Sequence, residues 1–357
     1  MLASENLKVD FYESGRGDTI VITFPGGGLG IVDAHPSPTG CRPEILRLLA
    51  GKVVHFVCLT HPHADHGRDL IPVLESHNRV EEFWHTNADI LPFIYRLREV
   101  PNWPSEVREF ARQMSGGFAN FLIDLYGAVV ERSIPIHAVC AGQEARIYDG
   151  VEVHAIGPEE AIQQEFLKYW IDKAGDQAAE RPDPNLLSAI LVLRWEKSVV
   201  VLGADALRPN WRAAVRRYQQ LKLPKALLLK VPHHGALNSL DVRSHSAEKG
   251  YLDICFHSEA ERCCSILFAG DVSHPNERVY ERLQARTEVY CLANGRNSPV
   301  AAVDLGIELE GARPVGDVRP CQPVVSVALD VAGNLRIVTG VNCSNCPRRS
   351  DASDDFS

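Results

Sequence analysis

The sequence has no long apolar run. No uninterrupted stretch of hydrophobic residues approaches the roughly 20 residues that a membrane-spanning helix needs. The first six residues, MLASEN, provide neither a basic start nor the apolar core of a signal peptide. We therefore expect a cytoplasmic protein that does not insert into a membrane.

The chain also lacks an excess of positive charge. Its 37 basic residues against 46 acidic ones give a net charge of −9, so the surface as a whole does not indicate nucleic-acid binding. A local basic groove remains compatible with this balance.

A complete zinc-binding cysteine set is missing as well. Cys343 and Cys346 form a single CxxC, whereas a structural zinc site needs four ligands. Cys321 or the adjacent Cys263 and Cys264 could complete such a site in principle. We favour free cysteines in a tail, residues 343–357, that is expected to be disordered.

What the sequence does contain is two strand-rich halves, each flanked by helical segments. Alternating or continuous apolar runs predict strands within residues 7–85 and again within 145–292, and a hairpin over 324–338 closes the fold. Apolar residues at helical spacing between about 90 and 138 predict a helical insertion. We therefore expect an α/β fold, an αββα sandwich, in one domain over residues 1–342.

The most informative stretch is Thr60-His-Pro-His-Ala-Asp-His-Gly67. Three histidines and one aspartate, His61, His63, Asp65 and His66, directly follow an apolar run that is typical of a buried strand. A loop at a strand end can turn all four side chains toward one point. Imidazoles and a carboxylate are ligands that zinc accepts, so the stretch predicts a metal site.

Two other strand ends carry ligand-type residues. Asp205 follows the apolar run 199–202, and His233 and His234 follow the run 228–231. Because the ends of successive strands meet at one edge of a sheet, we expect these side chains to join the histidine cluster. Together they provide enough ligands for two metal ions, between which Asp205 could form a bridge.

The order of these motifs resembles that of the metallo-β-lactamase superfamily. A narrower resemblance, to its competence-protein-like branch with the hydrolase domain of DNA-uptake channels, spans about residues 7–295 outside the insertion. It rests on the following residues: Val9-Asp10-Phe11, Gly15, Gly17, Asp18, Ile31-Val32-Asp33, Asn185, Ser188 and His274 to Val279.

The resemblance implies roles for single residues. His61 and His63 would bind a first metal, Asp65, His66 and His233 a second, and Asp205 would bridge them. Asp65 and His234 would act in catalysis, Asp65 on the attacking water and His234 beside the substrate. Residues that would orient a ligand or contact substrate are Asp33, Asn185, Ser188 and His274. The implied cofactor is Zn²⁺, as two ions, with Mn²⁺ as the alternative.

One expected ligand is absent. The superfamily often supplies a further histidine to the first metal, but the corresponding part of this chain, residues 153–158, has a glycine at the loop position. His154 and His85 are alternatives that we consider packed or surface residues, and Asn185 could fill the position. The number of metal ions is therefore left open.

Such a site predicts hydrolysis by a metal-bound hydroxide. A basic stretch without acidic residues, with Arg208, Arg212, Arg216, Arg217, Lys222, Lys225 and Lys230, is compatible either with a phosphate-binding approach or with a solvated helix face. With the branch resemblance, it favours a phosphodiesterase or nuclease acting on nucleic acid or another phosphodiester. The alternatives are an ester, lactone or thioester hydrolase, and a weakly catalytic binding or regulatory module.

Overall fold

The structure is a computed structural model that describes most of the predicted domain. The described residues are 6–12, 14, 17–35, 42–76, 79–86, 118–173, 182–239, 251–252, 263–269, 274–293, 324–330, 332 and 334–339. The helices predicted between residues 93 and 114, the CxxC motif and the tail 343–357 lie outside these ranges.

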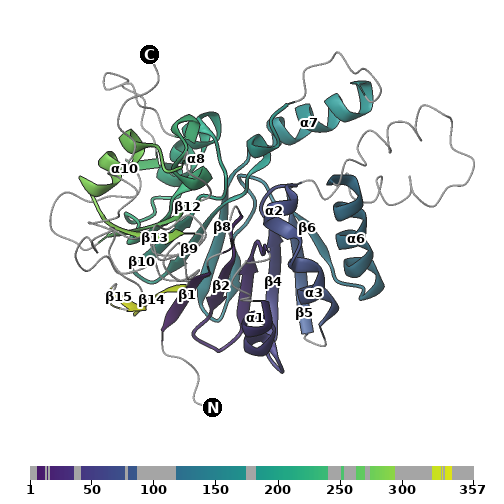
Figure 1. Ribbon diagram of the computed structural model, residues 1–357, viewed down its shortest axis with the longest axis horizontal. Coiled ribbons are helices and arrows are strands. Elements are labelled where there is room, and N and C mark those ends of the chain that lie inside the picture. Colours follow the sequence, from purple (N-terminus) through teal and green to yellow (C-terminus); the bar gives the residue numbers. More distant parts are fainter. Residues whose placement is uncertain are drawn as a thin grey trace, which may run out of the picture.

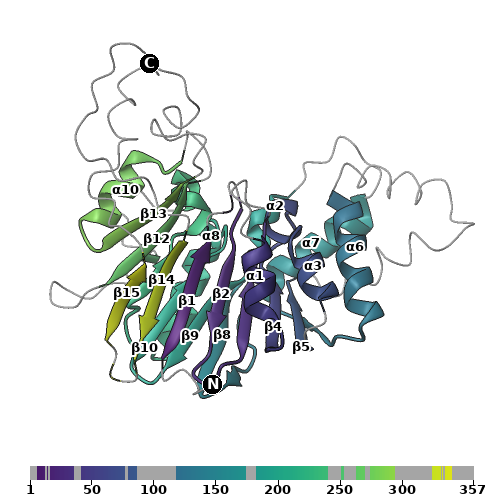
Figure 2. The same cartoon turned by 60° about the horizontal axis from the view of Figure 1, so that its bottom comes forward.

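The first of two β-sheets is built from the N-terminal half and the C-terminal hairpin (Figures 1 and 2). The predicted hairpin is present, and its first strand pairs with the N-terminal strand. In spatial order this sheet contains β15 (Leu335–Thr339), β14 (Val324–Leu329), β1 (Leu7–Tyr12), β2 (Ile20–Thr23), β3 (Leu29–Val32), β4 (Val53–Leu59), β5 (Arg79–His85) and β6 (Ile136–Ala138).

The second sheet is built from the C-terminal half. Its central strands β10, β11 and β12 are parallel, whereas β8 and β9 are antiparallel to their neighbours. In spatial order the sheet contains β13 (Glu288–Ala293), β12 (Cys264–Ala269), β11 (Leu228–Lys230), β10 (Ser198–Leu202), β9 (Ile190–Trp195), β8 (Val151–Gly157) and β7 (Arg146–Tyr148).

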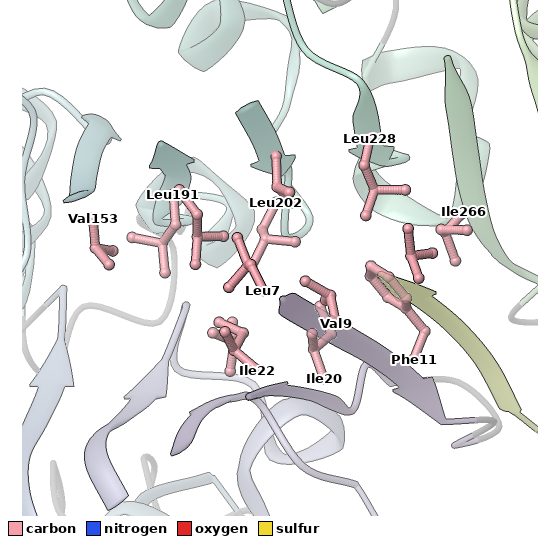
Figure 3. Packing of buried hydrophobic residues seen from close by; sticks show 14 of the residues in the cluster. Leu7, Val9, Phe11, Ile20, Ile22, Val153, Leu191, Leu202, Leu228 and Ile266 are labelled. Atoms are coloured by element: carbon pink, nitrogen blue, oxygen red, sulfur yellow. The ribbon is translucent and has the colours of Figure 1, made fainter. Parts of the chain in front are cut away.

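The two sheets pack face to face through a continuous apolar core (Figure 3). Alternate residues of β1, Leu7, Val9 and Phe11, enter this core because side chains alternate between the faces of a strand. Leu191 and Leu202 enter it from the second sheet. Burial of this apolar surface is the main favourable contribution to the association of the sheets.

Helices cover the two outer faces. On the first sheet, apolar residues of α1 (Arg42–Leu49), α3 (Leu70–Glu75) and α6 (Phe118–Glu131) pack against the strands. On the second sheet, α8 (Arg208–Gln220) and α10 (Glu277–Gln284) do the same. The protein therefore has the predicted αββα sandwich fold.

Local details differ from the sequence prediction. Strand β6 lies inside the range predicted as a helical insertion, yet it pairs with β5 as an edge strand of the first sheet. The helix α7 (Glu160–Lys173) follows β8. Within the described ranges, no helix combines the length and apolarity needed to cross a membrane.

The sheet arrangement brings several strand ends to one edge of the sandwich. Strands β3, β4 and β5 are parallel, so their carboxyl ends lie together, and the same holds for β10 and β11. A hydrogen bond of 2.9 Å from the Ala189 amide to the Thr60 carbonyl joins the two sheets at this edge. Short helical segments adjoin the strand ends: α2 (Ala64–Gly67) follows β4, η1 (Pro184–Leu187) precedes β9, and η2 (Pro232–Gly235) and η3 (Leu237–Ser239) follow β11.

Gly17 allows two loops of this edge to approach each other. A Cβ atom at this position would overlap the backbone carbonyl of Asp65, which belongs to the loop after β4. Backbone atoms cannot yield as a flexible side chain can, so any larger residue must push the loops apart.

We predict that Gly17→Ala lowers the free energy of unfolding by about 1–3 kcal/mol, the usual cost of overpacking. The matched control is Gly127→Ala in α6, where an added Cβ meets nothing within 4 Å. The control should be neutral or stabilising by about 0.5–1 kcal/mol, because alanine favours a helix over glycine. Chemical denaturation measures both, and equal midpoints for the two variants would contradict the close approach.

Candidate metal centre

Asp33, at the end of β3, orients the first histidine of the cluster through Thr60. The Thr60 amide and hydroxyl donate hydrogen bonds of 2.8 and 2.6 Å to Asp33 Oδ1 and Oδ2. Since the hydroxyl proton is directed to Asp33, Thr60 Oγ1 accepts from His61 Nδ1, 3.1 Å away. The lone pair of His61 therefore lies on Nε2.

The same carboxylate orients His66 directly. His66 Nδ1 donates to Asp33 Oδ2 over 2.8 Å, which leaves the lone pair on Nε2. That Nε2 atom is fully buried and lies 3.4 Å from Asp205 Oδ2. A carboxylate behind a histidine is the usual way in which proteins fix the tautomer and direction of a metal-binding imidazole.

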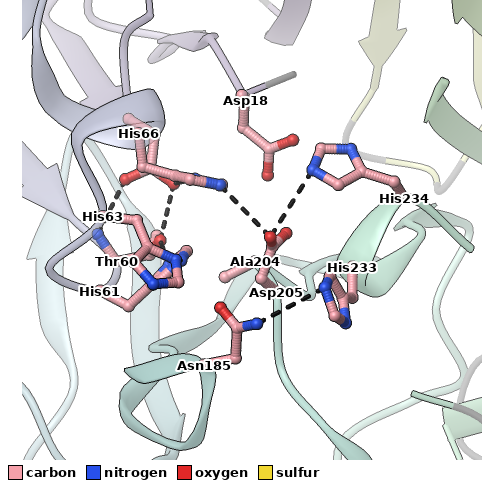
Figure 4. A network of polar contacts seen from close by, with 12 residues as sticks. Asp18, Thr60, His61, His63, His66, Asn185, Ala204, Asp205, His233 and His234 are labelled. Carbon is pink, nitrogen blue, oxygen red and sulfur yellow. Dashed lines mark hydrogen bonds and ion pairs between the residues drawn. The ribbon is translucent and has the colours of Figure 1, made fainter. Parts of the chain in front are cut away.

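His234 has the equivalent geometry on the opposite side of Asp205. Its Nδ1 donates to the Phe268 carbonyl over 3.1 Å, and its Nε2 lies 3.6 Å from Asp205 Oδ2. His233, by contrast, contacts Asn238 Oδ1 through Nδ1 at 2.9 Å and Asn185 Nδ2 through Nε2 at 3.5 Å. The geometry therefore favours His234, not the predicted His233, as a metal ligand (Figure 4).

Asp205 also faces a buried lysine. Lys230 Nζ lies 3.6 Å from Asp205 Oδ1, pairs closely with Asp18, and donates to the Ala204 carbonyl over 2.8 Å. Lys230 is 0% exposed, so it is not part of a basic surface, and this corrects the sequence interpretation that placed it in one. Its ammonium instead neutralises carboxylates inside the site.

The donor atoms form two overlapping groups around Asp205. Ligand atoms within 4.8 Å of one another belong to His61, His66 and Asp205 in one group, and to Asp18, Asp205 and His234 in another. A third group joins Asp18 and Asp33 to His66. In the described residues, none of these groups includes His63, Asp65 or His233, so their predicted ligand roles stay predictions.

These residues fit a divalent metal ion. Imidazole nitrogen and carboxylate oxygen are suitable donors for zinc, and all members of the groups are buried. His66 Nε2 has no hydrogen-bond partner among the described residues, which is costly for a buried polar atom unless another group satisfies it.

The protonation states agree with this reading. Burial, together with the neighbouring His66 and His63, holds the pKa of His61 well below its ordinary value, which favours the neutral imidazole that a metal ligand must be. Burial alone would raise the pKa of Asp205, but His234, His66 and Lys230 outweigh it and hold that pKa well below the ordinary value. Burial would lower the pKa of His66, yet the carboxylates of Asp205 and Asp33 raise it well above the ordinary value. A metal ion would replace the proton that these carboxylates attract.

A second, outer set of residues lies around the buried donors. His63, Asp65 and His233 are half-buried, whereas His61, His66 and His234 are buried. His63 Nδ1 lies 2.9 Å from His61 Nε2, which links the two sets. The outer set is therefore more accessible to an approaching molecule than the buried one.

Other residues predicted for the site occupy its surroundings. Asn185 contacts His233, and the His274 ring centre lies 6.0 Å from that of His233. Ser188 is fully buried, and its hydroxyl has no hydrogen-bond partner within the described ranges. His154 Nε2 pairs with Glu152 at 3.0 Å, so this histidine does not supply the missing ligand.

Sequence reasoning missed Asp18 as a site residue and misplaced Lys230. The signal for Asp18 was available, because Ile20 of β2 pairs with Val32 of β3 in an antiparallel hairpin. The residues just before β2 therefore lie beside Asp33, which follows β3. For the burial of Lys230, the only signal in the sequence was its position in an apolar strand.

Several site residues have a left-handed backbone. Asp33, Ala204, His233 and His234 have φ between 45° and 55°, a region that side-chain-bearing residues rarely adopt. Such conformations cost of order 1–3 kcal/mol each and are concentrated at functional sites in proteins. Here they occur directly after the ends of β3, β10 and β11, where the chain turns into the site.

Comparison with known proteins gives similarity of fold only. The sequence matches no protein-family model and no curated protein. Similar solved structures include zinc-bound PqqB from Methylobacterium extorquens, with 10% identity, a TM-score of 0.44, and coverage of 80% of this chain and 97% of that one. The metallo-β-lactamase-fold protein YhfI from Bacillus subtilis has 12% identity, a TM-score of 0.31, and coverage of 62% and 70%.

A third similar structure is an E377D mutant of the CmlA β-hydroxylase, with 13% identity and a TM-score of 0.33. The match covers 64% of this chain but only 35% of that one, so the chain spans about a third of that protein's length. At such low similarity no residue role is transferred, and the site is argued from its own contacts. The narrower competence-protein-like resemblance stays a prediction.

We predict that Asp33→Asn weakens metal binding by about 10–100-fold, the usual effect of losing the group behind a metal-binding histidine. An amide has only one acceptor oxygen, so its NH2 group must face either the Thr60 amide or the two donors that Oδ2 serves, and the three hydrogen bonds cannot all be kept. Competitive titration with a metal indicator measures the change. Asp149→Asn, which alters a carboxylate outside the site, is the control, and equal affinity of both variants would show that Asp33 does not orient the ligands.

Proposed function

We propose that this protein is a metal-dependent hydrolase whose metal is held by His61, His66, His234 and Asp205. The observation that carries the proposal is the shared orientation of the three imidazoles. Each directs its Nδ1 proton away from the site, to Thr60, Asp33 and Phe268. The Nε2 lone pairs of His66 and His234 thereby face Asp205, and that of His61 faces His63 Nδ1, a contact that a metal ion would replace.

This proposal changes the role of two neighbours. His234 takes the ligand position, and His233 takes the substrate-facing one, the reverse of the sequence prediction. The half-buried position of His233 and its contacts with Asn185 and Asn238 support this exchange.

A bound divalent ion would lower the pKa of a coordinated water to about 7 and so supply a nucleophile at neutral pH. The chain's own residues would do the rest. Asp65, at the accessible side, would orient the attacking water and accept its proton. His63 and His233 would contact the substrate on either side, because both are half-buried next to the buried ligands.

For the substrate we propose a phosphodiester, with nucleic acid as one candidate. Arg212, Arg216 and Arg217 lie on α8, the helix that begins three residues after Asp205. Two observations weaken the case that the basic stretch binds phosphate: Lys230 is buried, and Arg216 Nη2 lies 3.7 Å from Glu159. Because both reduce the free basic charge on this surface, ester, lactone or thioester hydrolysis is the second candidate.

A substrate panel tests the proposal directly. The zinc- or manganese-loaded protein should hydrolyse single-stranded DNA, double-stranded DNA, RNA or a small phosphodiester. Turnover of esters alone would favour the second candidate. Tight metal binding without turnover of any panel member would favour a binding or regulatory module.

We predict that Asp205→Asn loses metal and reduces turnover to background while the fold persists. The amide removes the negative charge that the surrounding imidazoles share, whereas the packing of β10 is unchanged. Elemental analysis, turnover and thermal unfolding measure the three effects. Asp124→Asn, an exposed position on α6, is the matched control. Normal metal content in Asp205→Asn would show that this carboxylate is not a ligand.

We also predict that replacing Arg212, Arg216 and Arg217 together by alanine weakens nucleic-acid binding and flattens its dependence on salt. Each lost phosphate contact should reduce the slope of log K against log salt by about 0.7 for single strands, because fewer counterions are released. Hydrolysis of a small uncharged ester, if the protein accepts one, should not change.

The control is a triple alanine variant of Arg79, Arg132 and Arg336, which removes the same charge from other parts of the surface. Equal salt slopes in the two triple variants would identify the α8 arginines as a solvated face. The substrate proposal would then move from nucleic acid to a small molecule.

A further inference from the structure

The buried Lys230 is the feature of the site that a two-metal arrangement does not explain. Its Nζ atom pairs with Asp18, lies 3.6 Å from Asp205 Oδ1, and lies 5.6 Å from the centre of the Phe268 ring. The side chain is 0% exposed and also donates to the Ala204 carbonyl. The ammonium therefore has a built position inside the donor cluster.

Because of this position, the two carboxylate oxygens of Asp205 face different partners. Oδ1 faces the ammonium, whereas Oδ2 faces His66 at 3.4 Å and His234 at 3.6 Å. One oxygen thus remains directed at imidazole donors. The bridging arrangement predicted from the sequence, with one oxygen for each of two ions, would require Lys230 to leave Asp205.

Asp18 is restricted in the same way. Its carboxylate belongs by distance to a donor group with Asp205 and His234, but it is already paired with Lys230. A divalent ion placed between Asp18 and Asp205 would lie beside the ammonium in a buried region. Like charges repel strongly at such distances in a buried environment.

The charges of the buried groups balance with one divalent ion. When ionised, the buried Asp18, Asp33 and Asp205 supply three negative charges, and the buried Lys230, when protonated, supplies one positive charge. One divalent ion supplies the remaining two, while the three inner histidines are neutral when they act as ligands. A second divalent ion would leave a buried excess of positive charge, which is costly without further anionic ligands.

Resting on the proposed function, we propose that Lys230 takes the place of a second metal ion, so that the protein binds one divalent ion per chain. Lys230 is a positioning residue: it holds Asp18 and one oxygen of Asp205, and it leaves His61, His66, His234 and Asp205 Oδ2 to the single ion. The remaining ligand of the ion is then substrate or water.

The test counts metal ions in the full-length protein. The protein is stripped with a chelator, reloaded with a small excess of Zn²⁺, freed of unbound zinc by gel filtration, and analysed for zinc per chain. The wild type should hold one ion. Lys230→Met, which keeps the length of the side chain without its charge, should hold two, because Asp18 and Asp205 Oδ1 become available.

Two further variants keep the test decisive. Lys230→Gln can still donate a hydrogen bond to Ala204 and should also hold two ions, so it replaces the methionine variant if that one does not fold. Lys222→Met, at an exposed position of the same segment, should hold one ion like the wild type. Cobalt substitution provides an independent readout, because two adjacent Co²⁺ ions couple magnetically and one does not.

The outcomes separate this inference from the proposed function. Two tightly bound ions in the wild type would overturn the role of Lys230 and leave the metal-hydrolase proposal standing. One ion in both the wild type and a folded Lys230 variant would also overturn it. No bound ion in the wild type would overturn both proposals.

Discussion

The Asp33 carboxylate is the interaction on which the rest of the site depends. It accepts three hydrogen bonds, two from Thr60 and one from His66, and through Thr60 it also fixes His61. Burial raises the pKa of this carboxyl group, but the three donated bonds favour its charged form. One acceptor thereby fixes the tautomers of two histidines and ties the loop after β4 to the end of β3.

The remaining buried donors of the site come from the second sheet. Asp205 and His234 follow β10 and β11 of the opposite sheet, and the hydrogen bond from Ala189 to Thr60 holds the two sheet edges together. The Ala204 carbonyl accepts from both the Lys230 ammonium and the His233 amide, which fixes the two loops of that sheet relative to each other. The site is therefore rigid because backbone groups of both sheets take part in it.

Most of the architecture could be predicted from the sequence, because apolar periodicity and the position of ligand-type residues after strands are local signals. The histidine cluster after β4 and Asp205 after β10 are examples. The roles of His233 and His234 could not be separated, since both have left-handed backbones and only three-dimensional packing decides which ring faces Asp205.

Burial of Lys230 could not be predicted either, because its place among basic residues suggested a surface, while its partner Asp18 is more than 200 positions away in the chain. Strand β6 is too short to give a periodic signal.

His66, His234 and Asp205 Oδ2 are proposed to converge on one metal ion, with Asp33 orienting His66 from behind. Anomalous diffraction from zinc-loaded crystals, recorded on both sides of the zinc absorption edge, locates such an ion without reference to activity. We expect one strong peak between the Nε2 atoms of His66 and His234, on the Oδ2 side of Asp205. A peak bound to His233 instead, or an ion between Asp18 and Asp205 Oδ1 with Lys230 displaced, would contradict it.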